Sequence, residues 1–175
     1  MKPRQVDWLT GDARFDWLAL NSVKLPPLPA SEELEPPLNP GAYALGVIAC
    51  SATKLTTAAP AERLYTGALF RLALSVAKQR CQRVRILSAK HGVLRLDTVV
   101  EPYDVGLASY EKHQVGWWAG LVQRALDGWR GQRVLCLASA PYWRPVFGAG
   151  AWERPLVGLG IGQQKAVLKA MLAAP

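Results

Sequence analysis

The sequence predicts an α/β fold: a single domain with a central parallel or mixed sheet flanked by helices, and a proline-rich N-terminal arm. Three short apolar runs, at residues 44–50, 84–88 and 133–138, have the composition of buried strands. The segments between them carry helical periodicity, and this alternation is typical of a sheet covered by helices. With 175 residues, of which 50% are hydrophobic, the chain is long enough to bury one substantial core.

The arm is predicted at residues 1–41 and the α/β domain at residues 42–175. Residues 25–40 contain six of the thirteen prolines. Proline fixes φ and lacks an N–H group, so this segment is expected to be an extended strap or linker rather than a helix or central strand. Trp8 and Trp17 lie before it, and if they are exposed they favour a homodimer.

The first strand is predicted at residues 44–50, because ALGVIAC is apolar throughout. A loop follows as far as Pro60, which suits the first turn of a helix. Gly67 is expected to interrupt this helix, and Thr66 is expected to cap a second segment with an apolar stripe.

The second strand, at residues 84–88, runs directly into a Lys-His-Gly turn. Ser109 is then expected to cap a helix that ends near Trp129. The third strand, at residues 133–138, precedes a polar and aromatic loop, and the last helix is predicted at residues 163–172.

The positive charge is concentrated in one part of the chain. The protein has a net charge of +8, and the window from Lys54 to Arg95 contains nine basic residues against the single acid Glu62. Such a field suggests a polyanionic partner, with nucleic acid favoured over a basic helix face that has no partner. The candidate phosphate contacts are Arg63, Arg71, Arg83 and Arg85.

The cysteine and histidine content and the lack of long apolar runs argue against several classes of function. Cys50, Cys81 and Cys136 form no CxxC pair, and there are two histidines, so neither a metal site nor another cofactor is predicted. No apolar run is long enough to span a membrane, and the charged N-terminus has no signal-peptide core, so we expect a cytoplasmic protein with no membrane partner.

Three loops are expected to meet, because the carboxyl ends of parallel strands share one edge of a sheet. They are residues 50–54, 88–92 and 139–144. The first, CSATK, supplies N–H groups, hydroxyls and an ammonium that suit an anion, although it lacks the P-loop pattern and also suits a plain turn. Gly160-Ile161-Gly162, at the start of a helix, is a second candidate anion site or simply a tight turn.

Two polar clusters carry the candidate chemistry. His91 can serve as general acid or base with Asp104 as its orienter or as the water activator; the alternative is a structural histidine and a turn-capping aspartate. Ser51 or Ser88 with His91 and Asp104 also forms a potential hydrolase triad, but there is no GxSxG elbow. Several aromatic residues near the loops can stack on a base or pack at the rim of the core: Tyr65, Tyr103, Tyr110, Tyr142 and Trp143.

The pattern CSATK, LYTGALF, ILSAKHGVL, DTVVEPYD and GIGQQ resembles a family of bacterial and phage domains with no settled function. It is more distantly similar to the YaaA peroxide-stress family, although Lys90-His91 stands where that family has an apolar-aromatic pair. The CSATK loop also resembles a domain of archaeosine synthase, which acts on a modified base in tRNA.

The YaaA resemblance implies a uracil-DNA-glycosylase-like α/β fold with a basic cleft and DNA binding. It marks residues in the converging loops and in the polar cluster beyond them: Cys50, Ser51, Lys54, Ser88, Lys90, His91, Gly92, Glu101, Pro102, Tyr103 and Asp104.

Three functions follow as hypotheses. The first is a DNA glycosylase that excises a modified or damaged base: Asp104 or Glu101 activates water, His91 binds the leaving base, and Tyr103 or Tyr65 stacks on it. The remaining loop residues would bind substrate: Cys50, Ser51, Lys54, Ser88, Lys90 and Gly92. The second is a DNA-binding protein without catalysis, and the third is an enzyme that acts on free nucleotides or nucleosides.

Overall fold

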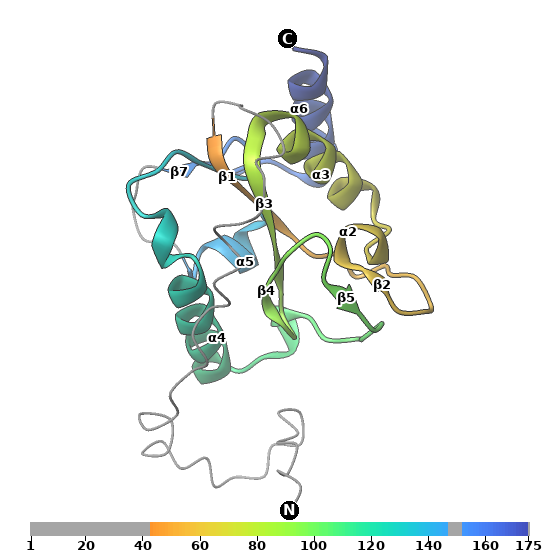
Figure 1. Cartoon of the computed structure of the whole chain (residues 1–175), viewed down its shortest axis with the longest axis vertical. Coiled ribbons are helices and arrows are strands. Elements are labelled where there is room, and N and C mark those ends of the chain that lie inside the picture. The colour runs from red at the N-terminus through yellow and green to blue at the C-terminus, as the bar shows by residue number, and fades with distance from the viewer. Residues whose placement is uncertain (1–42, 147–151, 175) are drawn as a thin grey trace, which may run out of the picture. The chain divides into compact units, whose positions relative to one another are not determined.

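Five strands form the main sheet of the computed structural model, which describes residues 43–146 and 152–174 (Figure 1). Their order is β4–β3–β1–β6–β7. The parallel strands are β1 (Tyr43–Ala49), β3 (Cys81–Ser88), β6 (Val134–Cys136) and β7 (Trp152–Glu153), and β4 (Gly92–Leu94) is antiparallel to β3. The predicted α/β class with a mixed sheet is therefore confirmed, whereas the predicted arm, residues 1–41, lies outside the described residues.

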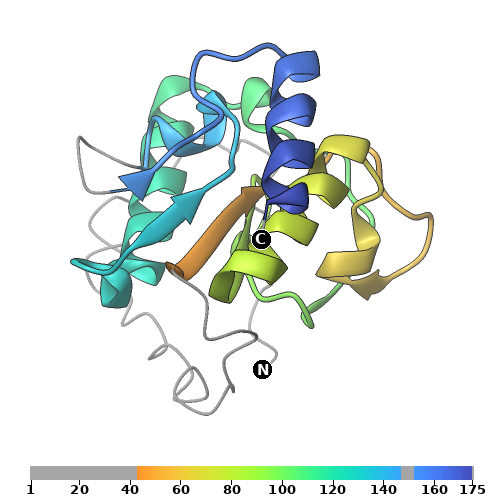
Figure 2. The same ribbon diagram turned by 90° about the horizontal axis from the view of Figure 1, so that it is seen from above.

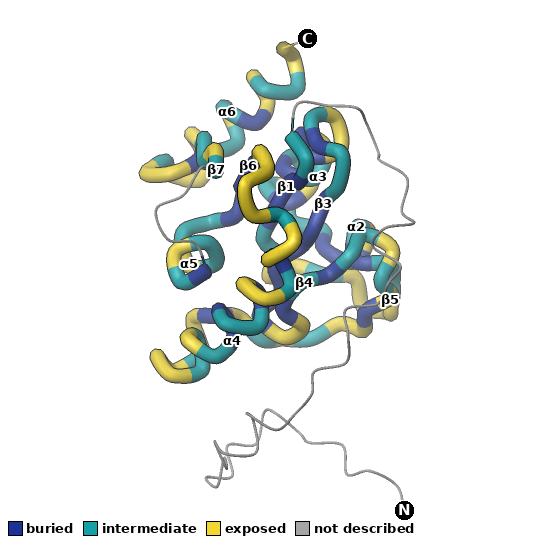
Figure 3. Tube along the Cα trace, turned by 60° about the vertical axis from the view of Figure 1, so that its left-hand side comes forward, coloured by how far each residue is buried: buried dark blue, intermediate teal, exposed yellow. Residues whose placement is uncertain are grey.

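The two central strands are buried on both faces, as their continuous apolar runs predict. β1 and β3 pair in register from Tyr43 with Cys81 to Ala49 with Leu87. Successive side chains point to opposite faces, so Ile48 joins one core cluster and Val47 the other. Figure 3 shows this buried centre, with the exposed residues on the outer helices and loops.

Helices cover both faces of the sheet. α3 (Ala68–Arg80) packs against α6 (Ile161–Ala173) on one face, and α2 (Ala61–Leu64) adds Leu64 to the same core cluster. α4 (Lys112–Ala125) and α5 (Ala140–Trp143) contribute to the cluster on the other face (Figures 1 and 2). No described helix combines the length and apolar character needed to cross a membrane.

Several predicted boundaries are wrong. Gly67 rather than Thr66 is the N-cap of α3. Glu111 rather than Ser109 caps α4, and the Glu111 N–H donates to Gln114 Oε1 at 2.8 Å. Ser109 instead ends the short helix η2 (Leu107–Ser109). α4 ends at Ala125, and the short helix η3 (Asp127–Trp129) follows it.

Four short strands were not predicted, among them β7 at one edge of the main sheet. β2 (Ala59–Pro60) and β5 (Val99–Val100) form a separate antiparallel pair, and β4 closes a hairpin with β3. Strands of two or three residues are too short to show the alternation by which strands are recognised.

The sheet reverses its direction of winding between β1 and β6. The chain leaves β1 through α2 and α3 and returns to β3 on one side of β1, whereas it leaves β6 through α5 and continues to β7 on the other side. In open α/β sheets, ligands bind in the crevice at such a switch point, beyond the carboxyl ends of the strands. The topology therefore directs attention to the loops after β1 and β6.

Candidate functional site at the carboxyl edge of the sheet

Tyr103 lies at the centre of the carboxyl edge. Its hydroxyl is 2.7 Å from the hydroxyl of Tyr65, which follows α2, and 2.7 Å from Ser88 Oγ at the end of β3. Tyr65 and Ser88 are buried, whereas Tyr103 is half-buried. Burial raises the pKa of both phenols, so the hydroxyls stay protonated and hold the three segments together.

Two lysines place positive charge over this aromatic pair. Lys54 Nζ is 4.3 Å from the centre of the Tyr103 ring and 5.9 Å from that of Tyr65, and Lys90 Nζ is 5.7 Å from the Tyr103 ring. These distances are within the range of cation–π attraction. A β-bridge between Lys54 and Tyr65 also fixes the backbone of the CSATK loop here. Lys54, Tyr65, Ser88, Lys90, His91 and Tyr103 are called the Tyr103 cluster below.

His91 contacts Tyr103 as well. Its imidazole meets the Tyr103 ring edge to face, with the ring centres 5.2 Å apart. Burial, and secondly the neighbouring Lys90 ammonium, lower the pKa of His91 below its ordinary value, so the imidazole is neutral at pH 7. A neutral imidazole can donate one hydrogen bond and accept another.

The hydrolase-triad hypothesis gains no support from these contacts. The His91 backbone N–H, not the imidazole, donates to Ser88 Oγ at 3.0 Å. The same oxygen is hydrogen-bonded to Tyr103, so the serine hydroxyl serves to join the hairpin turn to that phenol.

The loop after β6 reaches the same edge through α5. The Tyr142 hydroxyl lies 3.2 Å from Cys50 Sγ, which follows β1. Burial, together with the neighbouring Cys50 thiol, raises the pKa of Tyr142. Trp118 of α4 packs edge to face on Tyr142 and donates from its indole N–H to the Ser88 carbonyl at 2.8 Å. The three loops predicted to converge therefore meet.

The predicted catalytic carboxylates lie near this edge but outside its hydrogen-bond network. Glu101 and Asp104 flank the Pro102-Tyr103 pair in sequence, and both are exposed. Within the described residues, neither side chain has a hydrogen bond or an ion pair. The structure thus does not bring Asp104 into contact with the His91 imidazole.

Gly92 and Ser51 have structural roles. Gly92 has a φ of 70°, a conformation that favours glycine, and it pairs with Ser88 where the hairpin closes. Ser51 Oγ is 3.0 Å from Thr53 Oγ1 and accepts the Thr53 N–H at 3.2 Å. A Cβ atom on Gly67 would lie 2.3 Å from Ser51 Oγ, so the CSATK loop packs directly on the start of α3.

The predicted phosphate contacts divide into two groups. Arg63 on α2 and Arg71 in the first turn of α3 are exposed, and α3 begins at the carboxyl edge. Arg85 is 2% exposed and its guanidinium donates to the Val84 carbonyl, while Arg83 lies near the opposite end of β3. Because a phosphate at the carboxyl edge can reach neither, Arg83 and Arg85 do not belong to the candidate site.

Other basic residues of the window make contacts within the protein. Lys78 pairs with Glu62, and Arg95 forms an ion pair with Asp97. Arg80 donates to the carbonyls of Met171 and Ala174 near the end of α6. The excess positive charge in the sequence is thus distributed over several parts of the molecule.

Sequence reasoning did not identify two residues at this edge. Neither Trp118 nor Lys165 is among the predicted site residues, although Trp118 donates to the Ser88 carbonyl and Lys165 of α6 lines a cavity with Cys50 and Ser51. Lys165 is four positions after Ile161, so the two residues lie on the same face of the helix. This spacing from the predicted Gly160-Ile161-Gly162 anion site is the signal that points to Lys165.

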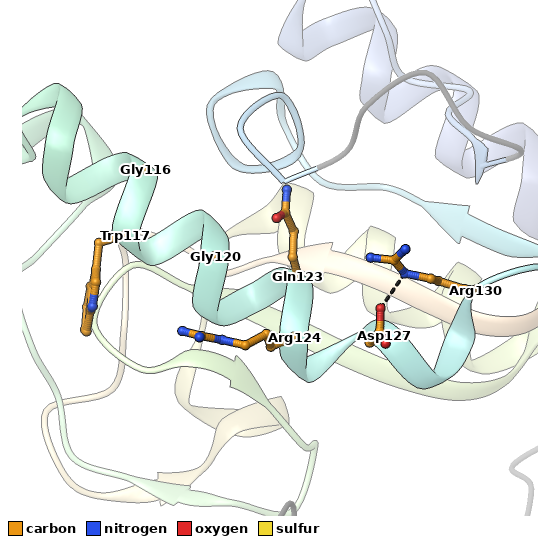
Figure 4. A pocket seen from close by; sticks show the side chains of 7 residues that line it. All are labelled: Gly116, Trp117, Gly120, Gln123, Arg124, Asp127 and Arg130. Atoms are coloured by element: carbon orange, nitrogen blue, oxygen red, sulfur yellow. Dashed lines mark ion pairs between the residues drawn. The ribbon is translucent and has the colours of Figure 1, made fainter. Parts of the chain in front are cut away.

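A second hollow, of about 510 Å³, lies on the outer side of α4, where Arg124 and the Asp127–Arg130 ion pair face solvent (Figure 4). None of the predicted site residues lines it. In residues 43–146 and 152–174, no group of three or more His, Cys, Asp or Glu side chains is placed to hold a metal ion.

Comparison with known proteins identifies a family but no characterised relative. No curated protein matches the chain. The model of a family of unknown function, DUF6884, matches residues 45–170, which include all the described elements of the carboxyl edge. The chain therefore belongs to the DUF6884 family.

Proposed function

We propose that this protein binds DNA at the carboxyl edge of its sheet and excises a modified or damaged base there. The observation that carries the proposal is the position of Lys54 Nζ, 4.3 Å from the Tyr103 ring centre. An aromatic face on which a base can stack, beside cations that neutralise phosphates, is the combination that single-stranded and extruded nucleotides require. The resemblance to the YaaA family supports DNA as the partner.

Each group at the edge has a role in this proposal. Lys54, Lys90, Arg63 and Arg71 bind phosphates, and Tyr103 stacks on the extruded base. Base excision breaks the N-glycosidic bond: water adds to C1′, and the base leaves with the bonding electron pair and takes up a proton from solvent. Asp104 or Glu101 accepts the proton of the water, and the neutral His91 hydrogen-bonds the departing base.

The test compares the wild-type protein with Asp104→Asn and His91→Ala on labelled duplexes and single strands that carry modified bases. Asp127→Asn, in η3 away from the edge, is the matched control. Binding and alkali-labile strand breaks are scored together. We expect breaks with the wild type and the control, and their loss in both site variants while binding is retained.

Lys54→Gln tests the binding step separately. Lys169→Gln removes an exposed cation from α6 and is its control. Loss of one phosphate contact reduces the dependence of log affinity on log salt concentration by about one unit. Equal affinities and salt slopes for the two variants would remove the Tyr103 cluster from the DNA-binding surface.

Exposure of Glu101 and Asp104 favours a second candidate function, DNA binding without catalysis. Carboxylates that activate water are generally held in place by neighbouring groups, and these two have no such partners among the described residues. Salt-sensitive binding by the wild type and both site variants, with no strand breaks on any substrate, would establish this function in place of excision.

A further inference from the structure

Two segments that the sequence marks separately as candidate anion sites line a single cavity of about 250 Å³. One is the start of the CSATK loop, represented by Cys50 and Ser51. The other is the start of α6, represented by Ile161. They are more than a hundred residues apart in the chain, and neither is a convincing site by itself.

The cavity lies at the switch point of the sheet. Ala49 and Cys50 line it from the end of β1, and Leu137 and Ser139 line it from the end of β6. These adjacent strands connect in opposite directions, so their loops separate and leave a crevice between them. The topology thus produces a ligand-sized space here without any specialised insertion.

The polar lining of the cavity suits an anion. Lys165 supplies an ammonium group, and Ser51 and Ser139 supply hydroxyls. The residues that line the cavity, all from the described ranges, include no Asp or Glu, and no carboxylate pairs with Lys165 in the part of the chain that the structure describes. The Lys165 ammonium is therefore not neutralised by any carboxylate of the described residues.

Two helices add to this positive potential. α3 begins at Ala68 and α6 begins at Ile161, and both residues line the cavity. Each helix is 13 residues long, and the N–H groups of a first turn have no partners within the helix. Lys165 and the hydroxyls therefore act together with the starts of two helices on one side of the sheet.

The rest of the lining is apolar and suits an organic group. Phe70 and Leu137 are buried, and Leu69 and Ile161 complete the wall. A fully hydrated inorganic ion would gain nothing from these side chains.

We propose that this cavity binds a small phosphate monoester, with its phosphate at Lys165, Ser51 and Ser139 and its organic part against the apolar wall. A phosphate has several acceptor oxygens for the ammonium and the hydroxyls. The site goes beyond the proposed DNA function and does not depend on it, because Lys165 is not part of the Tyr103 cluster.

The experiment measures binding to the full chain by calorimetry and by 31P NMR. The ligands are inorganic phosphate, ribose 5-phosphate, a nucleoside monophosphate and the two parent alcohols. A 5′-phosphorylated oligonucleotide and its unphosphorylated form distinguish a strand end from a free small molecule. We expect the monoesters to bind more tightly than both their alcohols and inorganic phosphate.

Lys165→Gln and the matched variant Lys169→Gln locate the site. Loss of a charge-assisted hydrogen bond should weaken monoester binding about ten- to hundredfold in Lys165→Gln and leave it unchanged in Lys169→Gln. If Lys165→Gln fails to fold, Ser139→Ala takes its place. Amide shifts in the wild type should move at Ala68, Ser139 and Ile161.

Three results would overturn the proposal: no binding by any monoester, equal loss in both lysine variants, or amide shifts confined to the Tyr103 cluster. The experiments distinguish failure of the monoester proposal from failure of the DNA proposal. DNA binding that persists in Lys165→Gln while monoester binding is lost separates the two sites, and preference for the 5′-phosphorylated strand alone assigns the cavity to a strand end.

Discussion

The Ser88 Oγ atom and the Tyr103 hydroxyl are 2.7 Å apart, and this contact joins the end of a central strand to the polar segment that follows β5. Ser88 is buried and also accepts the His91 backbone N–H. One serine thereby sets the positions of the Lys90-His91 turn and of the aromatic ring on which two lysines converge. The geometry of the candidate site thus depends on a residue that need not touch any ligand.

Replacement of Tyr103 by Phe should reduce stability but preserve binding. The phenol hydroxyl is lost, which removes its hydrogen bonds to Tyr65 and Ser88 and lowers the free energy of unfolding by about 1–3 kcal/mol. The ring remains, so DNA affinity should change little. Tyr103→Leu removes the ring as well and should reduce both stability and DNA affinity. Urea unfolding and fluorescence anisotropy measure the two effects. Equal affinities for Tyr103→Phe and Tyr103→Leu would argue against base stacking.

Gly67→Ala should be destabilising although Gly67 has an ordinary φ of −60°. The new Cβ would lie 2.3 Å from Ser51 Oγ and 3.1 Å from Ser51 Cβ, and relieving this overlap should cost about 1–3 kcal/mol. Adding Ser51→Gly should recover most of that loss. Gly116→Ala in α4 meets nothing within 4 Å and should instead stabilise by about 1 kcal/mol. Thermal denaturation of the wild type and the three variants tests both the expected loss and the expected gain of stability.

The stability of the protein should depend on pH through His91. Its pKa is below the ordinary 6.5, so between these two values the unfolded chain binds more protons than the native protein. The free energy of unfolding therefore rises with pH across that range and falls on acidification. An NMR titration of the imidazole gives the pKa directly. Lys90→Met should raise the His91 pKa only part of the way to 6.5, because burial lowers this pKa more than the Lys90 charge does. A His91 pKa of 6.5 in Lys90→Met would show that Lys90 is the main cause instead.

Alkylation should modify Cys50 alone. All three cysteines lie in the described ranges: Cys81 and Cys136 are buried, and burial raises their pKa values to about 12 and about 11, whereas Cys50 is half-buried. Only a thiolate reacts, so iodoacetamide at pH 8 should add a single group, located by mass spectrometry. Cys50→Ser should abolish the reaction, and a monoester in the adjoining cavity should slow it. Rapid reaction of Cys136 would indicate local opening of the sheet.

The central strands of the fold were predictable because strands that are buried on both faces consist mainly of apolar residues. Residues 44–50 are apolar throughout, residues 84–88 are apolar apart from Arg85 and Ser88, and both segments form strands in the middle of the sheet. The hairpin strand β4 was missed because Gly92-Val93-Leu94 is too short to show a period. Glu111 is the helix cap instead of Ser109, and its backbone N–H donates to the Gln114 side chain.

The candidate site was predictable in part for the same reason. Strand ends can be read from the chain, so the meeting of Cys50, Ser88 and Tyr142 loops follows from topology. The sequence does not tell which charged groups are accessible: Arg85 and Lys54 look equivalent in sequence, yet Arg85 is buried within β3 and Lys54 lies over Tyr103. These differences in accessibility depend on the direction in which each side chain points, and this direction cannot be predicted from composition.

The short outer strands of the sheet bear on how copies of this protein can associate. On one side the sheet ends in β4, with three residues, and on the other in β7, with two. A strand of this length exposes few unpaired peptide groups, so neither β4 nor β7 offers another chain a long template on which to extend the sheet. If two copies associate, we therefore expect contact through helices or loops, and fibrillar, strand-to-strand growth should be slow even at high concentration.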